Sequence, residues 1–458
     1  MTKSSPHQTH FTRQVRWLLD GVSGRGHSKH SVIQHATTFF QESAFISSQE
    51  KEDSAQNKLL TAQRIHNHAH LNSICLEILT LTEGNNFAET NRKTAQFLGT
   101  IQLITDTENH NIARENEKNR RLYRAILSLR LLDNLCANSI LKEPYILNCL
   151  EGVSLDKVHQ LSGMKEDKTH RYVSQVKVSI LMAGLLQDIG LCHPKSRKIL
   201  EGEDGTEDPF RELSSGERKA LNNINFRETC HYIEAGIGVG NYVGNCKEER
   251  DQYDEDEKVR IVFLKQLIKS SLSPKEDVGN VLKIPQIYTS IIFSTKNNYD
   301  YVLLPKVYHV LNKHAELGNC SKTVVNHLYQ ITGMFPQGYG IVYMPTDITG
   351  IQSDCYEYAI VNQLYPDNPI QPLCRMATRR LSFIGYGQDI EIKKVNNLYF
   401  HEMAKKMTNL SKERLNEILQ LLCSNAKERS NMDLLPRCWH PNNFFSLKTN
   451  QKLWNKLE

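Results

Sequence analysis

Apolar positions recur at helical spacing through most of the chain. The strongest example is a set of residues three or four positions apart, Val173, Val176, Ile180 and Ala183. This spacing places them on one face and predicts a buried helix. The glycine at 190 and the proline at 194 predict where that helix ends.

The N-terminal part divides into two regions that differ in composition and in the spacing of apolar positions. Residues 1–60 are rich in Ser, His, Gln and Thr, and we predict a flexible N-terminal arm with one or two short helices. Residues 61–150 have a helical pattern and are predicted as a helical N-terminal domain. The charged run 115–124 is predicted to be solvated, whereas a buried helix face follows it, formed by Ala125, Ile126, Leu129, Leu131 and Leu132.

Residues 151–336 are predicted as the central helical domain. Within it, Ser214 followed three residues later by Glu217 is typical of a capping box at the start of a helix. The acidic stretch 248–258 is predicted as an exposed helix face or loop.

The pattern changes after residue 336. Runs of β-branched and aromatic residues at 339–343, 356–361 and 380–383 are separated by Pro, Gly, Asp and Asn, which predicts a small β appendage at 337–400. Residues 401–458 are predicted as a C-terminal helix, over 402–427, and a tail that packs back on the body through Trp439 and Trp454. The predicted fold class is therefore mainly α, a helical bundle with a helical N-terminal region and a small β appendage.

Composition narrows the class of protein. The 458 residues are 39% hydrophobic and 23% charged, as in globular proteins. The net charge of +5 is spread along the chain without a dense basic stripe, so no nucleic acid polymer is expected as a partner. The eleven cysteines include no C-x-x-C pair, which favours reduced thiols in a cytoplasmic protein. We find neither a secretory signal nor an apolar run of the roughly 18 residues that a transmembrane segment needs.

One short motif points to a known family. Residues 185–190, Leu-Leu-Gln-Asp-Ile-Gly, resemble the Leu-Leu-His-Asp-Ile-Gly signature of HD-superfamily phosphohydrolases. Residues 324–338 end in Gly-Met-Phe-Pro-Gln-Gly, and 365–372 contain spaced prolines; both are similar to the end of HD-GYP domains. Residues 285–291 and 299–301 resemble a helix and a Tyr that lie between these motifs in the family. The resemblance covers about residues 150–375 and implies an HD-domain-like helical bundle related to cyclic di-GMP phosphodiesterases.

The departures from the family pattern concern its metal ligands. Gln187 stands in place of the metal-binding His, and Gln286 in place of an Asp. Residues 224–225, Ile-Asn, stand in place of a His-Pro pair, and Leu191 replaces a Lys. We find no counterpart of the family's His-His and Gly-Tyr-Pro loop, although Asp188 is kept.

These departures predict that the family's dinuclear metal centre does not form, and we expect no cofactor. An amide oxygen is a weak, neutral metal ligand, whereas imidazole and carboxylate bind iron or manganese well. Gln187 falls on the inner face that Val173 also occupies, so we expect its side chain to bridge helices by hydrogen bonds. Asp188 is either a surviving metal ligand or a residue at a helix end whose carboxylate binds local backbone groups.

Two alternative ligand sets remain open. Asp188 with His170, His193 and His231 would form a rewired site for divalent iron or manganese, with His327 as a further candidate, although such histidines more often pack or lie on the surface. On the β appendage, Arg375 and Arg379, with Arg380 beside Phe383, would suit an anionic ligand. Arginines at a sheet edge more commonly keep the edge soluble.

Two hypotheses of function follow from the resemblance. The first is a catalytically degenerate HD-GYP-like protein that acts as a regulatory or interaction module in bacterial signalling and binds a cyclic dinucleotide or a signalling protein. The second is an active metal-dependent phosphohydrolase that hydrolyses cyclic di-GMP with replaced ligands. The replacement of the family's metal ligands favours the first hypothesis.

Overall fold

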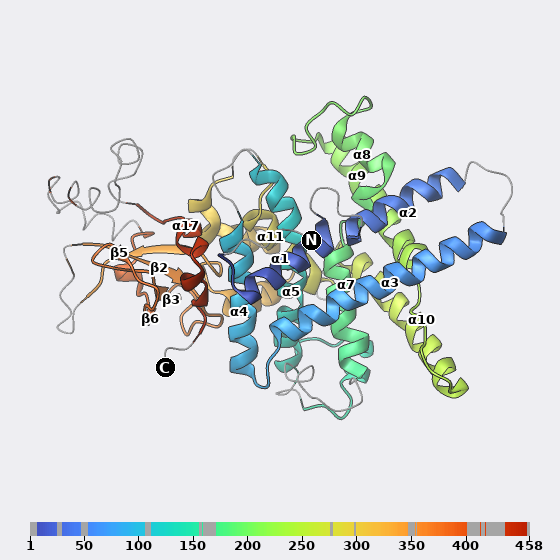
Figure 1. Ribbon diagram of the computed structural model, residues 1–458, viewed down its shortest axis with the longest axis horizontal. Coiled ribbons are helices and arrows are strands. Elements are labelled where there is room, and N and C mark those ends of the chain that lie inside the picture. Colours follow the sequence, from blue (N-terminus) through green and yellow to red (C-terminus); the bar gives the residue numbers. More distant parts are fainter. Residues whose placement is uncertain are drawn as a thin grey trace.

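The computed structural model describes residues 7–24, 30–46, 54–105, 111–154, 158, 171–274, 278–296, 299–346, 353, 355–400, 413, 417 and 436–455. These residues are mainly helical with a small sheet near the C-terminus, which confirms the predicted fold class (Figure 1). The sheet lies at one end of the molecule, and helices α2, α3 and α10 extend at the other end (Figure 1).

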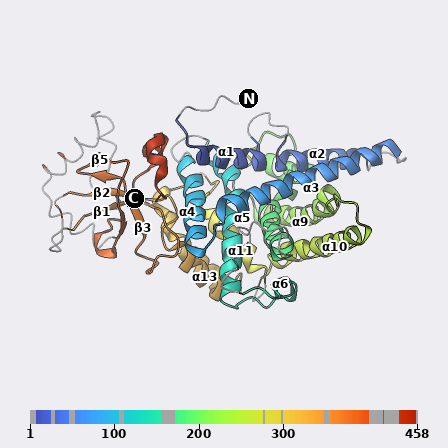
Figure 2. The same cartoon turned by 60° about the horizontal axis from the view of Figure 1, so that its bottom comes forward.

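The N-terminal segment is more ordered than its composition predicts. It forms α1 (His10–Ser23) and α2 (Val32–Ile46), and α3 (Ser54–Thr82) follows. Helix α1 buries an apolar stripe at positions 15, 18, 19 and 22, so it is part of the core. Helices α2 and α3 lie side by side (Figures 1 and 2). Helices α1 and α2 are the helices expected within residues 1–60, and α1 is packed in the core.

Helices α5 and α7 form the centre of the bundle. The elements here are α4 (Phe87–Ile104), α5 (Ile112–Ala137), α6 (Pro144–Cys149), a π-helical turn η2 (Tyr172–Lys177) and α7 (Val178–Leu186). The predicted helix over 173–183 is confirmed. Gly184 of α7 allows a close approach to α5, because a Cβ atom here would lie 2.7 Å from Cα of Ala125.

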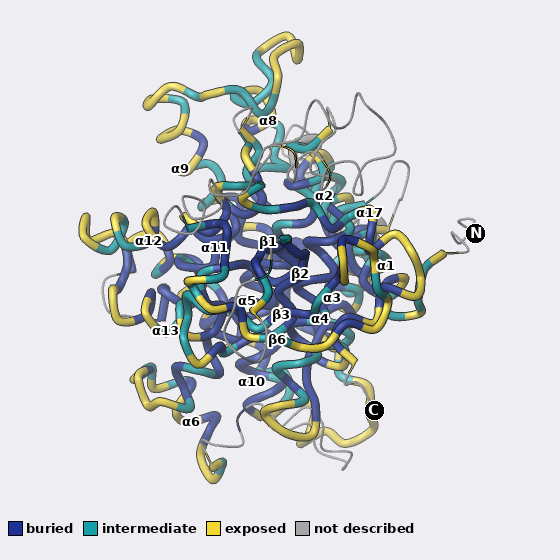
Figure 3. Tube along the Cα trace, turned by 90° about the vertical axis from the view of Figure 1, so that its left-hand side faces the viewer, coloured by how far each residue is buried: buried dark blue, intermediate teal, exposed yellow. Residues whose placement is uncertain are grey.

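The segment after α7 folds into short elements and two long helices. These are η3 (Ile189–Cys192), α8 (Pro194–Glu201), α9 (Ser215–His231), η4 (Tyr232–Ile237) and α10 (Lys247–Ser270). The capping box is confirmed: Ser214 Oγ accepts from Glu217 N at 3.2 Å, and the Glu217 carboxylate accepts from Ser214 N at 2.7 Å. The acidic stretch lies on α10 and is largely exposed, but Glu257 is buried against Arg260. Helices α8 and α9 stand at the exposed periphery (Figure 3).

Helix α11 (Asn280–Ile292) packs on α5. It is followed by η5 (Tyr301–Lys306), α12 (Val307–Glu316) and α13 (Lys322–Thr332). Gln286, predicted to stand in place of a family Asp, lies on α11, which contacts both α5 and α7.

The β appendage at 337–400 is present as a four-stranded antiparallel sheet. The order is β1 (Gly340–Tyr343), β2 (Glu357–Val361), β3 (Leu373–Met376) and β6 (Asp389–Glu391), with β4 (Thr378–Arg379) and β5 (Ser382–Phe383) forming a separate hairpin. The register pairs Ile360 with Arg375 and Arg375 with Asp389. Strands β1 and β2 are buried on both faces, so the sheet is integrated into the body.

The tail packs back on the body, as predicted. Its elements are α17 (Asn442–Ser446) and η7 (Lys448–Lys452), and η6 (Lys394–Asn396) ends the sheet region. Trp439 stacks on Tyr358 with ring centroids 4.7 Å apart, and Trp454 packs directly on Gly99 of α4. Gln451 Oε1 accepts from Thr9 N and from Thr12 Oγ1, both at 2.9 Å, so the two ends of the described chain are joined. The helix predicted at 402–427 lies outside the described residues except for positions 413 and 417.

One connected cluster of buried apolar side chains extends from Val15 to Trp454. The core therefore crosses all the predicted domain boundaries, and the division at residues 60, 150, 336 and 400 stays a prediction. One helical run, 172–192, is long and apolar enough to cross a membrane, but 89% of its most apolar window is buried inside the protein.

Candidate functional site

The motif that resembles the HD signature lies where α7 ends. Gln187 follows α7 directly, and Asp188 precedes η3. Gly190 lies against α9, because a Cβ atom at this position would be 2.8 Å from Cα of Asn225. Gly190 N donates to Thr229 Oγ1 at 3.1 Å, and Asn225 Nδ2 donates to Gln187 O at 3.1 Å. Glycine is required here for close packing, which fixes the direction in which Asp188 points.

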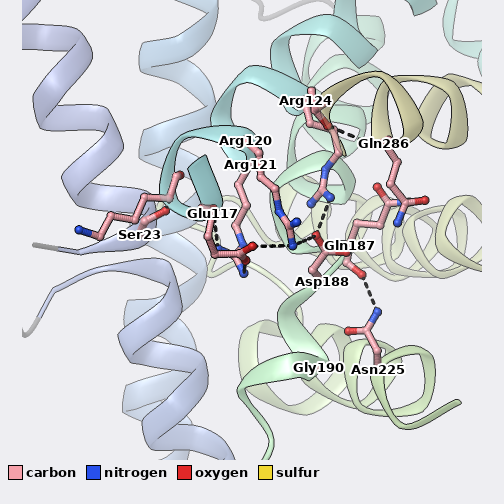
Figure 4. Close-up of polar contacts among 12 residues, drawn as sticks. Ser23, Glu117, Arg120, Arg121, Arg124, Gln187, Asp188, Gly190, Asn225 and Gln286 are labelled. Carbon is pink, nitrogen blue, oxygen red and sulfur yellow. Dashed lines mark hydrogen bonds and ion pairs between the residues drawn. The ribbon is translucent and has the colours of Figure 1, made fainter. Parts of the chain in front are cut away.

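Asp188 forms a buried ion pair with Arg124 of α5. Its Oδ2 lies 2.6 Å from Nη1 of Arg124, and Arg124 Nε donates to Gly184 O at 2.9 Å (Figure 4). Arg124 is only 1% exposed and Asp188 only 7%. The carboxylate thus binds a side chain 64 positions away, rather than the local backbone groups considered in the sequence analysis.

Further cations surround this carboxylate. Arg120 Nη2 lies 3.6 Å from Asp188 Oδ2, and Arg121 and the half-buried Lys283 also interact electrostatically with it. Burial alone would raise the pKa of Asp188, but Arg124, Arg120 and Arg121 together hold that pKa well below its usual range. Asp188 is therefore ionised and its charge is compensated by protein cations.

The prediction that the run 115–124 is solvated is wrong for its arginines. Arg121 and Arg124 are buried, and Arg124 follows the adjacent pair Arg120 and Arg121 by four and three positions, which brings the three side chains together on α5. That spacing is the signal in the sequence that could have identified them. Several of their donors have no hydrogen-bond partner among the described residues: Nε of Arg120, Nε of Arg121 and Nη2 of Arg124.

The side chain of Gln187 makes no hydrogen bond to another helix within the described ranges. It is 5% exposed, and its Oε1 is buried with no hydrogen-bond partner among the described residues. Its contact with α9 is made by the backbone carbonyl instead. An unpartnered buried amide oxygen is costly, and it leaves one polar group available next to Asp188.

The rewired histidine set is not assembled by its described members. His170 lies outside the described residues. His193 and His231 both approach Glu228, at 4.0 and 3.5 Å, and they form no close group of three ligands with Asp188. His193 Nδ1 accepts from Lys195 N at the start of α8, and His327 Nδ1 lies 2.8 Å from Asn134 Oδ1.

The arginines of the β appendage have different roles. Arg375 is buried and pairs with Asp389 at 2.6 and 3.2 Å, and its Nη2 also donates to Asn455 O at 2.7 Å. These bonds hold β3, β6 and the tail together, so Arg375 is not free for an anion. Arg379 and Arg380 are exposed on the β4–β5 hairpin.

A large basic cavity adjoins the arginines of α5. Its volume is about 930 Å³, and it is lined by residues of α1, α2, α5, η3, α8 and α9, of the loop between α8 and α9, and of positions 295–296. Its lining contains eight basic side chains against four acidic ones. The basic residues are Arg114, Lys118, Arg120, Arg121, Arg197, Arg211, Arg218 and Lys296.

Some of these cations are compensated and others are not. Arg121 pairs with Glu117 at 2.9 Å, and Arg197 pairs with Glu201. Arg114, Arg218 and Lys296 have no ion pair among the described residues. The cavity therefore combines the size of a ligand site with an excess of positive charge. Sequence reasoning missed it because its cations come from separate elements.

Comparison with known proteins finds no relative of this chain. No family model matches the chain, and neither a curated protein nor a solved structure matches it.

Proposed function

We propose that this chain is a catalytically inactive regulatory module of bacterial signalling, built on an HD-GYP-like helical frame, that binds an anionic ligand of the cyclic-dinucleotide class. One observation carries the proposal. At the His-Asp position of the resembled motif, Arg124 Nη1 lies 2.6 Å from Asp188 Oδ2. A permanent protein cation thus compensates the carboxylate that would otherwise bind a metal.

The charges around Asp188 oppose a metal ion. A divalent ion about 4 Å from one guanidinium would be repelled by about 8 kcal/mol at an effective dielectric constant near 20. Arg124 is held in place by Gly184 O as well as by Asp188, so it would have to break two contacts to move away. Gln187 offers only a neutral amide in compensation.

The same charges favour an anion. The cavity borders Arg120 and Arg121, each of which has a buried Nε donor without a partner in the described part of the chain. Guanidinium groups bind phosphate through paired hydrogen bonds, and hydrogen bonds to charged groups contribute about 1.5–3 kcal/mol each. A phosphodiester ligand would pair with Arg114, Arg218 and Lys296, the exposed cations of the cavity that have no ion pair among the described residues.

The first experiment tests inactivity. The full-length protein is incubated with cyclic di-GMP and either manganese or ferrous iron, and linear products are separated by chromatography. We expect no hydrolysis above the rate without protein. Hydrolysis that disappears in Asp188→Ala together with bound metal would overturn the proposal and support an active phosphodiesterase with replaced ligands.

The second experiment tests the ligand by calorimetric titration with cyclic di-GMP. Arg218→Glu reverses one exposed, uncompensated charge of the cavity and should weaken binding by about 10–100-fold. The control is Arg250→Glu, which makes the same change at an exposed position on α10 outside the cavity. Equal affinities of the two variants, or no binding by the natural protein, would refute the cavity as the ligand site.

A further inference from the structure

Histidines from α2 and α3 form a cluster remote in sequence from the HD-like motif. His30 lies two residues before the start of α2, His35 lies on α2, and His66 lies on α3. One ligand nitrogen from each of these three residues lies within 4.8 Å of the other two. Nitrogens bound to one zinc ion are separated by about 3.3 Å, so small side-chain rotations bring all three into coordination distance.

A fourth imidazole adjoins this cluster. His70 follows His66 by one helical turn, and its ring centroid is 5.0 Å from that of His35. His70 Nε2 lies 3.3 Å from the carbonyl oxygen of Gly21 in α1. Because a carbonyl only accepts, Nε2 carries the hydrogen and Nδ1 keeps its lone pair. A histidine that ligates a metal usually donates its other ring N–H to such a group.

The surroundings suit neutral imidazoles. Burial, followed by the neighbouring His70, His66 and His30, lowers the pKa of His35 to about 4. His30 and His66 are exposed and His35 is half-buried, so an ion could enter from solvent. Imidazole nitrogens gathered in this way suit a divalent ion of the zinc, nickel or copper class.

We propose that His30, His35, His66 and His70 form a binding site for a divalent transition metal ion of the zinc class, which fastens α2 to α3. This site does not depend on the proposed function, because its ligands are neither Asp188 nor residues of the basic cavity. The ion would nevertheless act near that cavity: Ile33 of α2 lines it, and Phe40 of α2 packs on His193 with ring centroids 5.3 Å apart. Metal binding would therefore hold one wall of the cavity in place.

The test uses the full-length protein freed of metal with a chelator and dialysed. Titration with zinc chloride in a calorimeter should show one ion per chain. Addition of cobalt chloride should produce the visible absorption bands of four-coordinate cobalt. His35→Ala and His66→Ala should each weaken zinc binding by more than about 100-fold, and His70→Ala by at least about 10-fold.

The matched control is His309→Ala, which removes an exposed histidine on α12. It should bind zinc as the natural protein does. Zinc should also raise the melting temperature of the natural protein and of the control, but not that of His66→Ala. Because His66 is exposed, this variant should fold even if His35→Ala does not. Absence of zinc binding by the natural protein, or undiminished binding by His66→Ala, would overturn the proposal.

Discussion

Replacing Asp188 with Asn should destabilise the fold strongly, although the two side chains have nearly the same shape. Arg124 is 1% exposed, and Asp188 is its ionic partner at 2.6 Å. Removing one member of a buried ion pair costs about 3–5 kcal/mol, because the other charge stays buried. We expect about 3 kcal/mol, since the asparagine oxygen can still accept a hydrogen bond from Arg124.

The free energy of unfolding is measured by urea denaturation, followed by circular dichroism and tryptophan fluorescence. Asp251→Asn on α10 is the matched control, because Asp251 is exposed, and it should change stability by less than about 0.5 kcal/mol. The double variant combines Arg124→Met with Asp188→Asn. Its loss of unfolding free energy should be smaller than the sum of the losses in the two single variants, by at least about 1 kcal/mol. A loss below about 1 kcal/mol in Asp188→Asn, or additive losses, would refute the argument that the pair replaces a metal.

The pH dependence gives an independent check. The pKa of Asp188 in the folded protein lies below its ordinary value of 3.8. Its contribution to stability is therefore fully present well above that value and is lost as the pH falls through and below it. The stability difference between the natural protein and Asp188→Asn should be constant near neutral pH and should narrow only in acid below about pH 4.

Two further predictions concern the packing around the site. Lys177→Met removes a buried ammonium that lies 2.5 Å from Glu83 Oε1, and it should lower the free energy of unfolding by about 3–5 kcal/mol in urea denaturation; a change below about 1 kcal/mol would contradict this. Gly190→Ala forces a methyl group against the backbone of Asn225 and should cost about 1–3 kcal/mol. Gly216→Ala, where a Cβ atom meets no other atom within 4 Å, is its control and should leave the melting temperature unchanged or slightly raised; equal losses in both glycine variants would rule out the close approach as the cause.

Local signals predicted much of the fold. The capping box at Ser214 and Glu217 involves residues three positions apart, so the sequence contains all that determines it. The helix over 173–183 and the β region at 337–400 follow from periodicity and from turn residues. The short helices expected in the N-terminal arm are also local, since α1 has an apolar stripe at positions 15, 18, 19 and 22 that predicts a helix by spacing alone.

The site could not be predicted in the same way. The partner of Asp188 lies 64 residues away, and a charged run shows no sign in sequence of which members become buried. The motif therefore identified where the site lies, whereas its chemistry depends on the packing of α5 against α7. The histidine cluster also joins two helices, although the spacing of His66 and His70 by one turn is a signal that could have been noticed.

The bonds from Gln451 to the first turn of α1 have a consequence for how the protein is made. Thr9 and Thr12 leave the ribosome more than four hundred residues before the side chain that satisfies them. During synthesis, Thr9 N and Thr12 Oγ1 remain hydrated until residue 451 has left the ribosome. This contact therefore forms late in synthesis, and a nascent chain that stalls before residue 451 lacks it.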